Sequence, residues 1–491
     1  MADKGKSLSK GGVYYLIYNV LNMAFPFITG VYVARKLLSA NIGEVAAAQN
    51  LATYFTILAF LGIPTYGLRE IAKVRNDKEK RNLVFSELYV INLISTIVFC
   101  ALYFALILAV PKYSENFKLY AITGIAIALN AFNISWMYEG MEEFRFISIR
   151  NLVFKAASFL LLVLLVRKTE DYMKYAVVTV LGTAGNYIVN MIYSPRFAKL
   201  SFHDLNLRRH MRAILYLVMV NLAIEIYSLM DITMMNYMSS AESIAYYKYG
   251  IGIHRILLQV VNTFTMVLVP RISYYYKENR KEDFNLLVSK GMKLIILTAV
   301  PMIIGIQFVS NFLIPKLYGE EYLPSAIVLR MFSVLLLISP TGYLLGSRML
   351  LVTDHEKKMV ICVGSGAVVN LIGNAILIPI LHEYGATIAS IISEIVVMMV
   401  YVYFGRKYFN LIKMKGTIWK TAAAGFAMTA VLLACSFLEI NEWMKLIVQV
   451  AMAVATYLVA MVLMKEDTIS QYTNAIRKRV MHRFTHRGTG V

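Results

Sequence analysis

The chain has 491 residues, of which 59% are hydrophobic and 16% are charged, and its mean hydropathy is +0.61. Long uncharged runs of this kind exclude an assembly of soluble domains and predict a polytopic membrane protein. The net charge of +20 is explained by cytoplasmic loops that face anionic membrane lipid, so it requires no nucleic-acid partner.

Fourteen apolar segments reach the length that crosses a bilayer, about 20 helical residues. In chain order they cover residues 11–34, 44–66, 83–110, 116–138, 151–166, 175–193, 213–238, 245–270, 288–314, 324–346, 358–381, 384–405, 417–437 and 442–464. They predict an all-α membrane protein with about 14 transmembrane helices. The basic residues 1–10 lead directly into the first segment, so we expect an uncleaved first helix.

The positive charges predict the orientation. If the N-terminus is cytoplasmic, 36 of the 49 Lys and Arg residues lie in cytoplasmic segments, which predicts that both termini are cytoplasmic. The last residues, 465–491, form a basic amphipathic tail that we expect to lie on anionic membrane lipid.

An internal repeat divides the chain. A turn, an apolar helix and a basic loop begin at Ser39 and recur in the same order from Ser239. Six predicted helices before and six after give two six-helix lobes in a parallel pseudo-repeat, plus two C-terminal helices. The predicted divisions are residues 1–205 for the N-terminal lobe, 206–410 for the C-terminal lobe, 411–464 for the last two helices and 465–491 for the tail.

The sequence contains none of the common nucleotide-binding, metalloprotease or hydrolase motifs. We find no Walker A sequence, no HExxH, no nucleophile elbow and no dinucleotide-binding fingerprint. The three cysteines fit neither a disulfide framework nor a metal site. We therefore predict that the protein is not an enzyme and that it has no cofactor or metal. The energy for its work would come from an ion gradient, of H⁺ or Na⁺, or from the substrate itself. Short extracytoplasmic loops also disfavour a membrane glycosyltransferase or polymerase.

The segments 213–238 and 245–270 carry the densest polar pattern. The first holds Asn221, Glu225, Ser228 and Asp231 at helical spacing, and the second holds Lys248, Arg255, Gln259 and Asn262. Charged groups at membrane depth are costly, so the two stripes predict the lining of an aqueous cavity.

Cations at membrane depth indicate an anionic substrate such as a phosphate or diphosphate. The predicted substrate-binding residues are Arg255, Lys248, Arg330 and Lys155, with Tyr18, Asn19 and Asn22 on the first helix placed to hold sugars. The predicted ion-coupling residues are Asp231, Glu225, Glu394 and His254. The acidic residues Glu44, Glu87 and Glu139 lie near helix ends, which argues against an acidic cavity for cationic drugs.

Each of these residues also has a structural interpretation. Asp231 and Arg255 would form a buried ion pair that holds the helical hairpin together. His254 would hydrogen-bond a neighbour, and Glu394 would pair with Arg330. Lys155 and Lys248 would extend to the membrane interface, and the aromatic residues of the first helix would pack against their neighbours.

Four local sequences resemble a known family. They are GIPTYGLREIAK, SWMYEGMEEFRFISIRN, LYGEEYLPSAIVLR and AVVNLIGNAILIPILHEYGATIASIISE. In order and spacing they resemble the O-antigen and capsule repeat-unit flippases of the multidrug/oligosaccharidyl-lipid/polysaccharide (MOP) superfamily. The resemblance implies two lobes around a central cavity. It identifies Asp231 with the family's acidic residue in the seventh helix and Tyr247 with its following tyrosine. It also makes Arg69 and Glu70 gate or structural residues.

The resemblance implies a function in polysaccharide biosynthesis at the bacterial cytoplasmic (inner) membrane. The expected activity is translocation of an undecaprenyl-diphosphate-linked oligosaccharide to the outer leaflet by alternating access. The resemblance also points to a polysaccharide polymerase or a chain-length protein as a partner. A lipid II flippase and a multidrug cation antiporter of the same superfamily remain the alternatives.

Overall fold

The computed structural model describes residues 22, 24–352, 355–406 and 414–470, and helices are the regular elements throughout these ranges. The described parts of all fourteen predicted segments are largely helical, which confirms the all-α fold class. Within the described ranges, ten helices are long and apolar enough to span a membrane, or eleven with one bent pair. Helices satisfy their own backbone hydrogen bonds, as hydrocarbon requires. The chain is a multi-pass membrane protein.

Two compact units make up the chain. The first unit contains residues 1–249, 317–322 and 374–386, and the second unit contains residues 250–316, 323–373 and 387–491. Residues 317–322 and 374–386 are later in sequence than most of the first unit, yet they pack with it. The predicted lobe boundaries near residues 205 and 410 stay a prediction.

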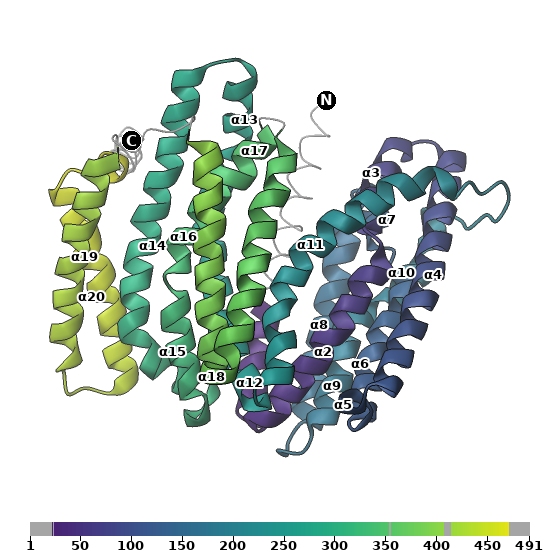
Figure 1. Cartoon of the computed structure of the whole chain (residues 1–491), viewed down its shortest axis with the longest axis horizontal. Coiled ribbons are helices and arrows are strands. Elements are labelled where there is room, and N and C mark those ends of the chain that lie inside the picture. Colours follow the sequence, from purple (N-terminus) through teal and green to yellow (C-terminus); the bar gives the residue numbers. More distant parts are fainter. Residues whose placement is uncertain (1–21, 23, 353–354, 407–413, 471–491) are drawn as a thin grey trace, which may run out of the picture. The chain divides into compact units, whose positions relative to one another are not determined.

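The first unit is a helical bundle that starts with residues 24–34 (Figure 1). Its further helices are α2 (Ser39–Phe60), α3 (Ile63–Val74), α4 (Lys78–Ala109), α5 (Pro111–Ser114), α6 (Phe117–Leu129), α7 (Ser135–Gly140), α8 (Phe144–Leu165), α9 (Tyr172–Ala184), α10 (Asn186–Tyr193) and α11 (Arg208–Met238). Helix α2 packs against α4, α6 and α11, and α8 packs against α9. A core that includes Phe85, Trp136 and Tyr138 holds α3, α4 and α7 together.

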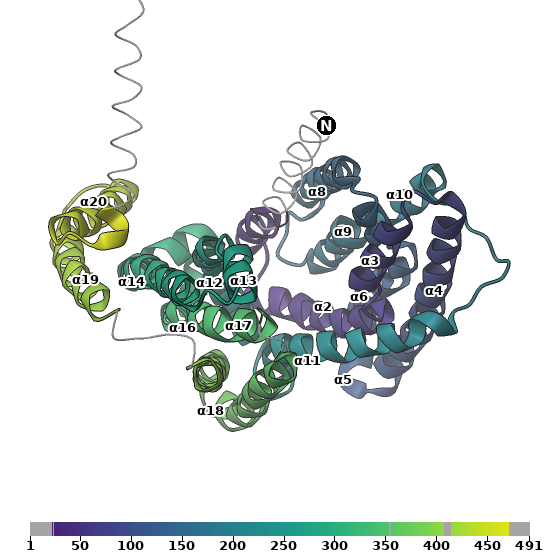
Figure 2. The same cartoon turned by 90° about the horizontal axis from the view of Figure 1, so that it is seen from above.

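The second unit continues the chain from helix α12, as Figure 2 shows from above. Its helices are the end of α12 (Ala241–Met266), α13 (Val269–Lys277), α14 (Lys281–Tyr318), α15 (Leu323–Phe332), α16 (Leu335–Gly342), α17 (Arg348–Val352), most of α18 (Glu356–Gly405), α19 (Lys415–Ser436) and α20 (Glu442–Leu463). Helix α18 contains two predicted segments that meet at His382, where a φ of 52° interrupts the helix. Large apolar side chains such as Trp419 and Phe426 on α19 and Phe437 directly after it are exposed, as expected for a lipid-facing surface.

The sequence repeat has a structural form. Helix α2 is followed by a two-residue break, the Pro-started helix α3 and the long helix α4. Helix α12 is likewise followed by a two-residue break, the Pro-started helix α13 and the long helix α14. We call residues 61–62 the first joint and residues 267–268 the second joint. Leu61 and Gly62 have left-handed φ values of 49° and 70°, whereas both residues of the second joint keep negative φ.

Candidate functional site

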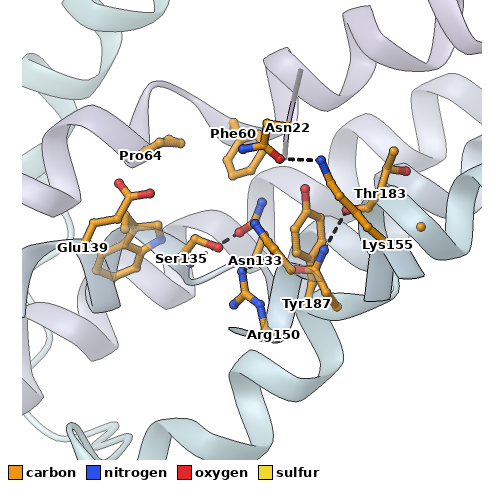
Figure 3. A pocket seen from close by; sticks show the side chains of 14 residues that line it. Asn22, Phe60, Pro64, Asn133, Ser135, Glu139, Arg150, Lys155, Thr183 and Tyr187 are labelled. Carbon is orange, nitrogen blue, oxygen red and sulfur yellow. Dashed lines mark hydrogen bonds between the residues drawn. The ribbon is translucent and has the colours of Figure 1, made fainter. Parts of the chain in front are cut away.

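A polar cavity of about 300 Å³ lies inside the first unit, and we call it the first cavity (Figure 3). It is lined by Asn22, Phe60, Pro64, Asn133, Ser135, Trp136, Glu139, Arg150, Asn151, Lys155, Gly182, Thr183, Asn186 and Tyr187. These residues lie around three interruptions: the first joint, the turn between α6 and α7, and the boundary of α9 and α10. Irregular backbone at membrane depth is tolerated where it lines a cavity, and broken helices form many transporter sites.

Two cations line the first cavity. Lys155 lies near the middle of α8, and its Nζ donates a hydrogen bond of 2.5 Å to Asn22 Oδ1. Arg150 is one α8 turn and a half earlier, with 6% of its surface exposed, and its Nη2 donates to Asn151 Oδ1 at 3.1 Å. Figure 3 shows the side chain of Lys155 directed towards Asn22, and both cations line the cavity. The structure therefore brings together the predicted residues Lys155 and Asn22 and adds Arg150 to them.

Neutral polar groups complete the lining. Asn186 Nδ2 donates to the Thr183 carbonyl oxygen at 3.1 Å. Among the described residues, Asn186 Oδ1 and Trp136 Nε1 have no hydrogen-bond partner, although both side chains are buried. Buried polar atoms without a partner are costly, so a bound molecule or water is expected to satisfy them. The lining offers hydrogen bonds and aromatic faces as well as positive charge.

Two charged residues of this cavity were not predicted. Arg150 directly precedes the predicted segment 151–166, and Glu139 was predicted only to lie near a helix end. The helix breaks after Leu129 and resumes at Ser135, and the chain turns at Glu142, whose φ is 62°. This turn places α7 and the start of α8 beside the cavity. The signal that could have found them is the run of Glu139, Arg150 and Lys155 within 17 residues of one apolar region.

A second cavity of about 230 Å³ adjoins the first joint. It shares Phe60 and Pro64 with the first cavity and is also lined by Ile57, Gly62, Thr65, Val218 and Glu225. Glu225, a predicted ion-coupling residue, is exposed on α11. Phe60 and Pro64 thus line both cavities. The first cavity contains Arg150, Lys155 and Glu139, and, among the described residues, Glu225 is the charged residue of the second cavity.

Asp231 is buried in the first unit, with 6% of its surface exposed. The hydroxyl group of Tyr247 donates to Asp231 Oδ2, and Asn374 Nδ2 donates to Oδ1 at 2.7 Å. The three residues come from α11, α12 and α18. The resemblance singled out Asp231 and Tyr247, and the structure places them in contact and adds Asn374. Tyr247 and Asn374 thus supply two neutral donors to a buried carboxylate.

The remaining predicted residues are spread over both units. In the first unit, Lys248 is half-buried, Arg69 is exposed on α3, and Glu70 forms a 2.6 Å ion pair with Lys73. In the second unit, Arg255 is exposed, Arg330 is half-buried, His254 is buried against the Phe332 ring, and Glu394 accepts a 2.7 Å hydrogen bond from Ser339. Tyr18 and Asn19 lie outside the described residues. The roles assigned to all of these residues stay predictions.

Comparisons with known proteins give the following similarities. The sequence model of a family described as "Polysaccharide biosynthesis protein" matches residues 8–276. A protein of Escherichia coli (strain K12) named "Putative O-antigen transporter" is 20% identical, over 82% of this chain and 97% of that protein. Capsular polysaccharide biosynthesis protein CapF of Staphylococcus aureus is 22% identical, over 81% of this chain and 98% of CapF.

Two solved structures share the fold. The lipid II flippase MurJ in an inward closed conformation matches with a TM-score of 0.74 and 16% identity, covering 92% of this chain and all of that one. An inward-facing multidrug resistance MATE family transporter of the MOP superfamily matches with a TM-score of 0.62 and 14% identity, covering 78% of this chain and 93% of that one. At these identities the similarity describes the fold alone.

Proposed function

Because the chain belongs to the polysaccharide biosynthesis protein family, we propose that it is a flippase for a lipid-diphosphate-linked oligosaccharide. The family resemblance found in the sequence is confirmed by that match. The proposed activity moves the oligosaccharide from the cytoplasmic to the outer leaflet of a bacterial cytoplasmic membrane, with both termini of the chain in the cytoplasm. The relatives named as an O-antigen transporter and a capsular polysaccharide biosynthesis protein support a substrate from surface polysaccharide synthesis.

The observation that carries the proposal is the first cavity. Arg150 and Lys155 supply two positive charges, and cationic side chains form strong charge-assisted hydrogen bonds with phosphate oxygens. Asn133, Asn186 and Tyr187 offer the neutral hydrogen bonds and ring faces that suit sugar hydroxyl groups. A lipid-diphosphate-linked sugar combines these two chemistries in one headgroup. The predicted roles of Arg255, Lys248 and Arg330 as further phosphate contacts remain part of the proposal.

Transport would proceed by alternating access, in which the two halves of the chain move relative to a bound substrate. Asp231 is the proposed site of the coupling ion, H⁺ or Na⁺, with Glu225, Glu394 and His254 as further candidates. A buried carboxylate held by Tyr247 and Asn374 offers oxygen atoms to a cation, and the carboxylate also accepts a proton. The ion can bias transport only through different affinities for the two states.

Two related activities compete with this proposal. A multidrug cation antiporter would need a cavity that attracts cations, and the two cations of the first cavity disfavour it. A lipid II flippase would also need cations, because lipid II carries a diphosphate. The two substrates share the diphosphate and differ in the attached sugars. The sugars that the cavity accepts therefore distinguish an oligosaccharide flippase from a lipid II flippase.

The test is translocation in liposomes that contain the purified protein and a lipid-diphosphate-linked oligosaccharide. The double variant Arg150→Gln and Lys155→Gln should lower the rate by about ten- to hundredfold, because two charge-assisted hydrogen bonds are lost. Lys168→Gln is the matched control, since Lys168 is exposed in the loop after α8 and its replacement also removes a positive charge. A full rate in the double variant would overturn the proposal, and transport of lipid II alone would change the substrate.

A further inference from the structure

Glu139 is the one charged residue of the first cavity that the proposed function leaves without a role. It lies on α7, half-buried, and its side chain lines the same space as Arg150 and Lys155 (Figure 3). Within the described part of the chain it forms no hydrogen bond and no ion pair through its side chain. Arg150 nevertheless acts on it electrostatically. A carboxylate that shares a cavity with two cations without forming an ion pair with either is an unusual arrangement.

The elements around α7 contribute few other charges. Helix α7 packs against α3 and α8. On α3, Glu70 pairs with Lys73, and Arg69 is exposed. The nearby Glu142 pairs with Arg75 at 2.7 Å, and Arg145 at the start of α8 is exposed. Arg150 and Lys155 are therefore the cations that share the first cavity with Glu139.

The charges of the cavity have a direct consequence for binding. Arg150, Lys155 and an ionised Glu139 give a net charge of +1, whereas the diphosphate diester of a lipid-linked sugar carries two negative charges. Glu139 therefore repels the ligand that the two cations attract. A group that repels a ligand in one protonation state makes its binding depend on pH.

We propose that Glu139 is a built-in counter-charge that weakens the hold of Arg150 and Lys155 on the substrate's diphosphate, so that the substrate can leave. This inference rests on the proposed function. A transporter must bind its cargo strongly enough to admit it and weakly enough to release it. Two partly desolvated cations alone would hold a diphosphate tightly, and the carboxylate in the same cavity limits that affinity. Protonation of Glu139 removes the repulsion and strengthens binding.

The test measures affinity in full-length protein with a short-chain isoprenyl diphosphate linked to one sugar. This probe is a diester, so its phosphates keep their charge between about pH 5 and pH 8. In Glu139→Gln the affinity at neutral pH should be about tenfold higher than in the wild type, because one charge repulsion is removed. Affinity of the wild type should rise as the pH falls, and affinity of Glu139→Gln should change much less. Glu139→Asp keeps the charge and should retain the wild-type pH profile.

Transport distinguishes this role from a structural one. Glu139→Gln should bind the probe more tightly and translocate the natural lipid-linked substrate more slowly, because release becomes slow. Damage to the fold would lower both quantities. If Glu139→Gln cannot be purified folded, calorimetry on the wild type in buffers of different ionisation enthalpy replaces it. Binding should then take up protons at mildly acidic pH, and the absence of uptake would overturn the inference.

The outcomes separate this inference from the proposed function. If the wild type binds the probe, Arg150→Gln loses binding, and Glu139→Gln has the affinity and pH profile of the wild type, then the counter-charge is wrong and the phosphate site stands. If neither protein binds the probe at any pH, the phosphate site itself is wrong, and the counter-charge fails with it.

Discussion

The two joints of the repeat share a backbone plan and differ in what surrounds them. At the first joint, Leu61 and Gly62 adopt left-handed φ values, and the neighbouring Phe60 and Pro64 line two cavities. At the second joint, the backbone stays right-handed, and Leu268 packs against a core that contains Leu344. The same sequence of long helix, break and proline-started helix thus borders a polar site in one half and a packed core in the other.

The arginines near the two joints show the same contrast. Arg150 of the first unit lines a cavity of about 300 Å³. Arg348 of the second unit donates from Nη1 to Thr265 Oγ1 at 3.1 Å, close to the end of α12. Thr265 is 1% exposed, so the acceptor of this partly buried hydrogen bond is inside the packed region. We infer that the same backbone plan accepts different side chains in the two repeats. These side chains decide whether a joint borders a ligand site or a packed core.

The largest effect is expected from a matched pair of arginine replacements. Arg150→Gln should reduce translocation by about tenfold with little loss of thermal stability, because one charge-assisted contact to the substrate is removed. Arg348→Gln should lower the free energy of unfolding by about 1–2 kcal/mol, since it disturbs a partly buried hydrogen bond, and should leave the rate per folded molecule close to normal. Equal effects of both variants on rate would contradict the comparison.

The joints themselves give the next test. Gly62 has a φ of 70°, and a Cβ atom there would lie 2.9 Å from Leu217 Cβ. Gly62→Ala should therefore lower the free energy of unfolding by about 1–3 kcal/mol. Val267→Ala at the second joint should change it by roughly 0.5 kcal/mol or less, because Val267 is exposed and has negative φ. Thermal unfolding of both variants in detergent compares them directly, and a stable Gly62→Ala protein would show that the first joint is not strained.

The sequence predicts the helices well because lipid leaves few alternatives. Long apolar runs must become helices, and the described parts of all fourteen predicted segments did. The contact between Lys155 and Asn22 joined two predicted residues 133 positions apart. The contact between Asp231 and Tyr247 joins a residue that the polar pattern had singled out to one that only the family resemblance had singled out.

The residues that the sequence did not predict lie at the boundaries between apolar segments and a polar stretch. Arg150 and Glu139 border a polar stretch that hydropathy assigns to a loop. Their place in the cavity depends on the break between α6 and α7 and on the left-handed turn at Glu142. Asn374 lies in the predicted segment 358–381, but its partner Asp231 is 143 positions earlier in the chain. Periodicity describes one helix at a time and therefore cannot predict such pairs.

A smaller effect is expected at the carboxylates of the two units. Tyr247→Phe removes a donor to Asp231 in the first unit, and Ser339→Ala removes a donor to Glu394 in the second. Each should lower the free energy of unfolding by about 0.5–1.5 kcal/mol. If Asp231 binds the coupling ion, only Tyr247→Phe should shift, by a few-fold, the ion concentration that gives half the maximal transport rate. A shift in Ser339→Ala alone would transfer the ion site to Glu394.

The smallest effect concerns the turns that join paired helices in the two repeats. Between α8 and α9, Asp171 pairs with Lys174 at 2.6 Å and accepts hydrogen bonds of 2.9 Å from the backbone N–H groups of Lys168 and Arg167. These contacts, led by the one to Lys174, hold the pKa of Asp171 below its usual value. In the second repeat the matching turn lies at His382, whose Nδ1 is 3.0 Å from the Ser239 hydroxyl oxygen.

A carboxylate whose pKa is lowered by folding contributes stability above its unfolded pKa, about 3.9 for Asp, and loses that contribution as the pH falls through the folded value. Asp171→Asn should therefore lower the thermal midpoint at neutral pH, and its difference from the wild type should shrink once the pH falls below about 4. In His382→Asn, asparagine tolerates the left-handed φ and no carboxylate is removed. The difference in thermal midpoint between this variant and the wild type should therefore persist at low pH. If both differences persist at low pH, the ionised form of Asp171 does not stabilise its turn. The contrast between the repeats would then be confined to the joints and the cavity.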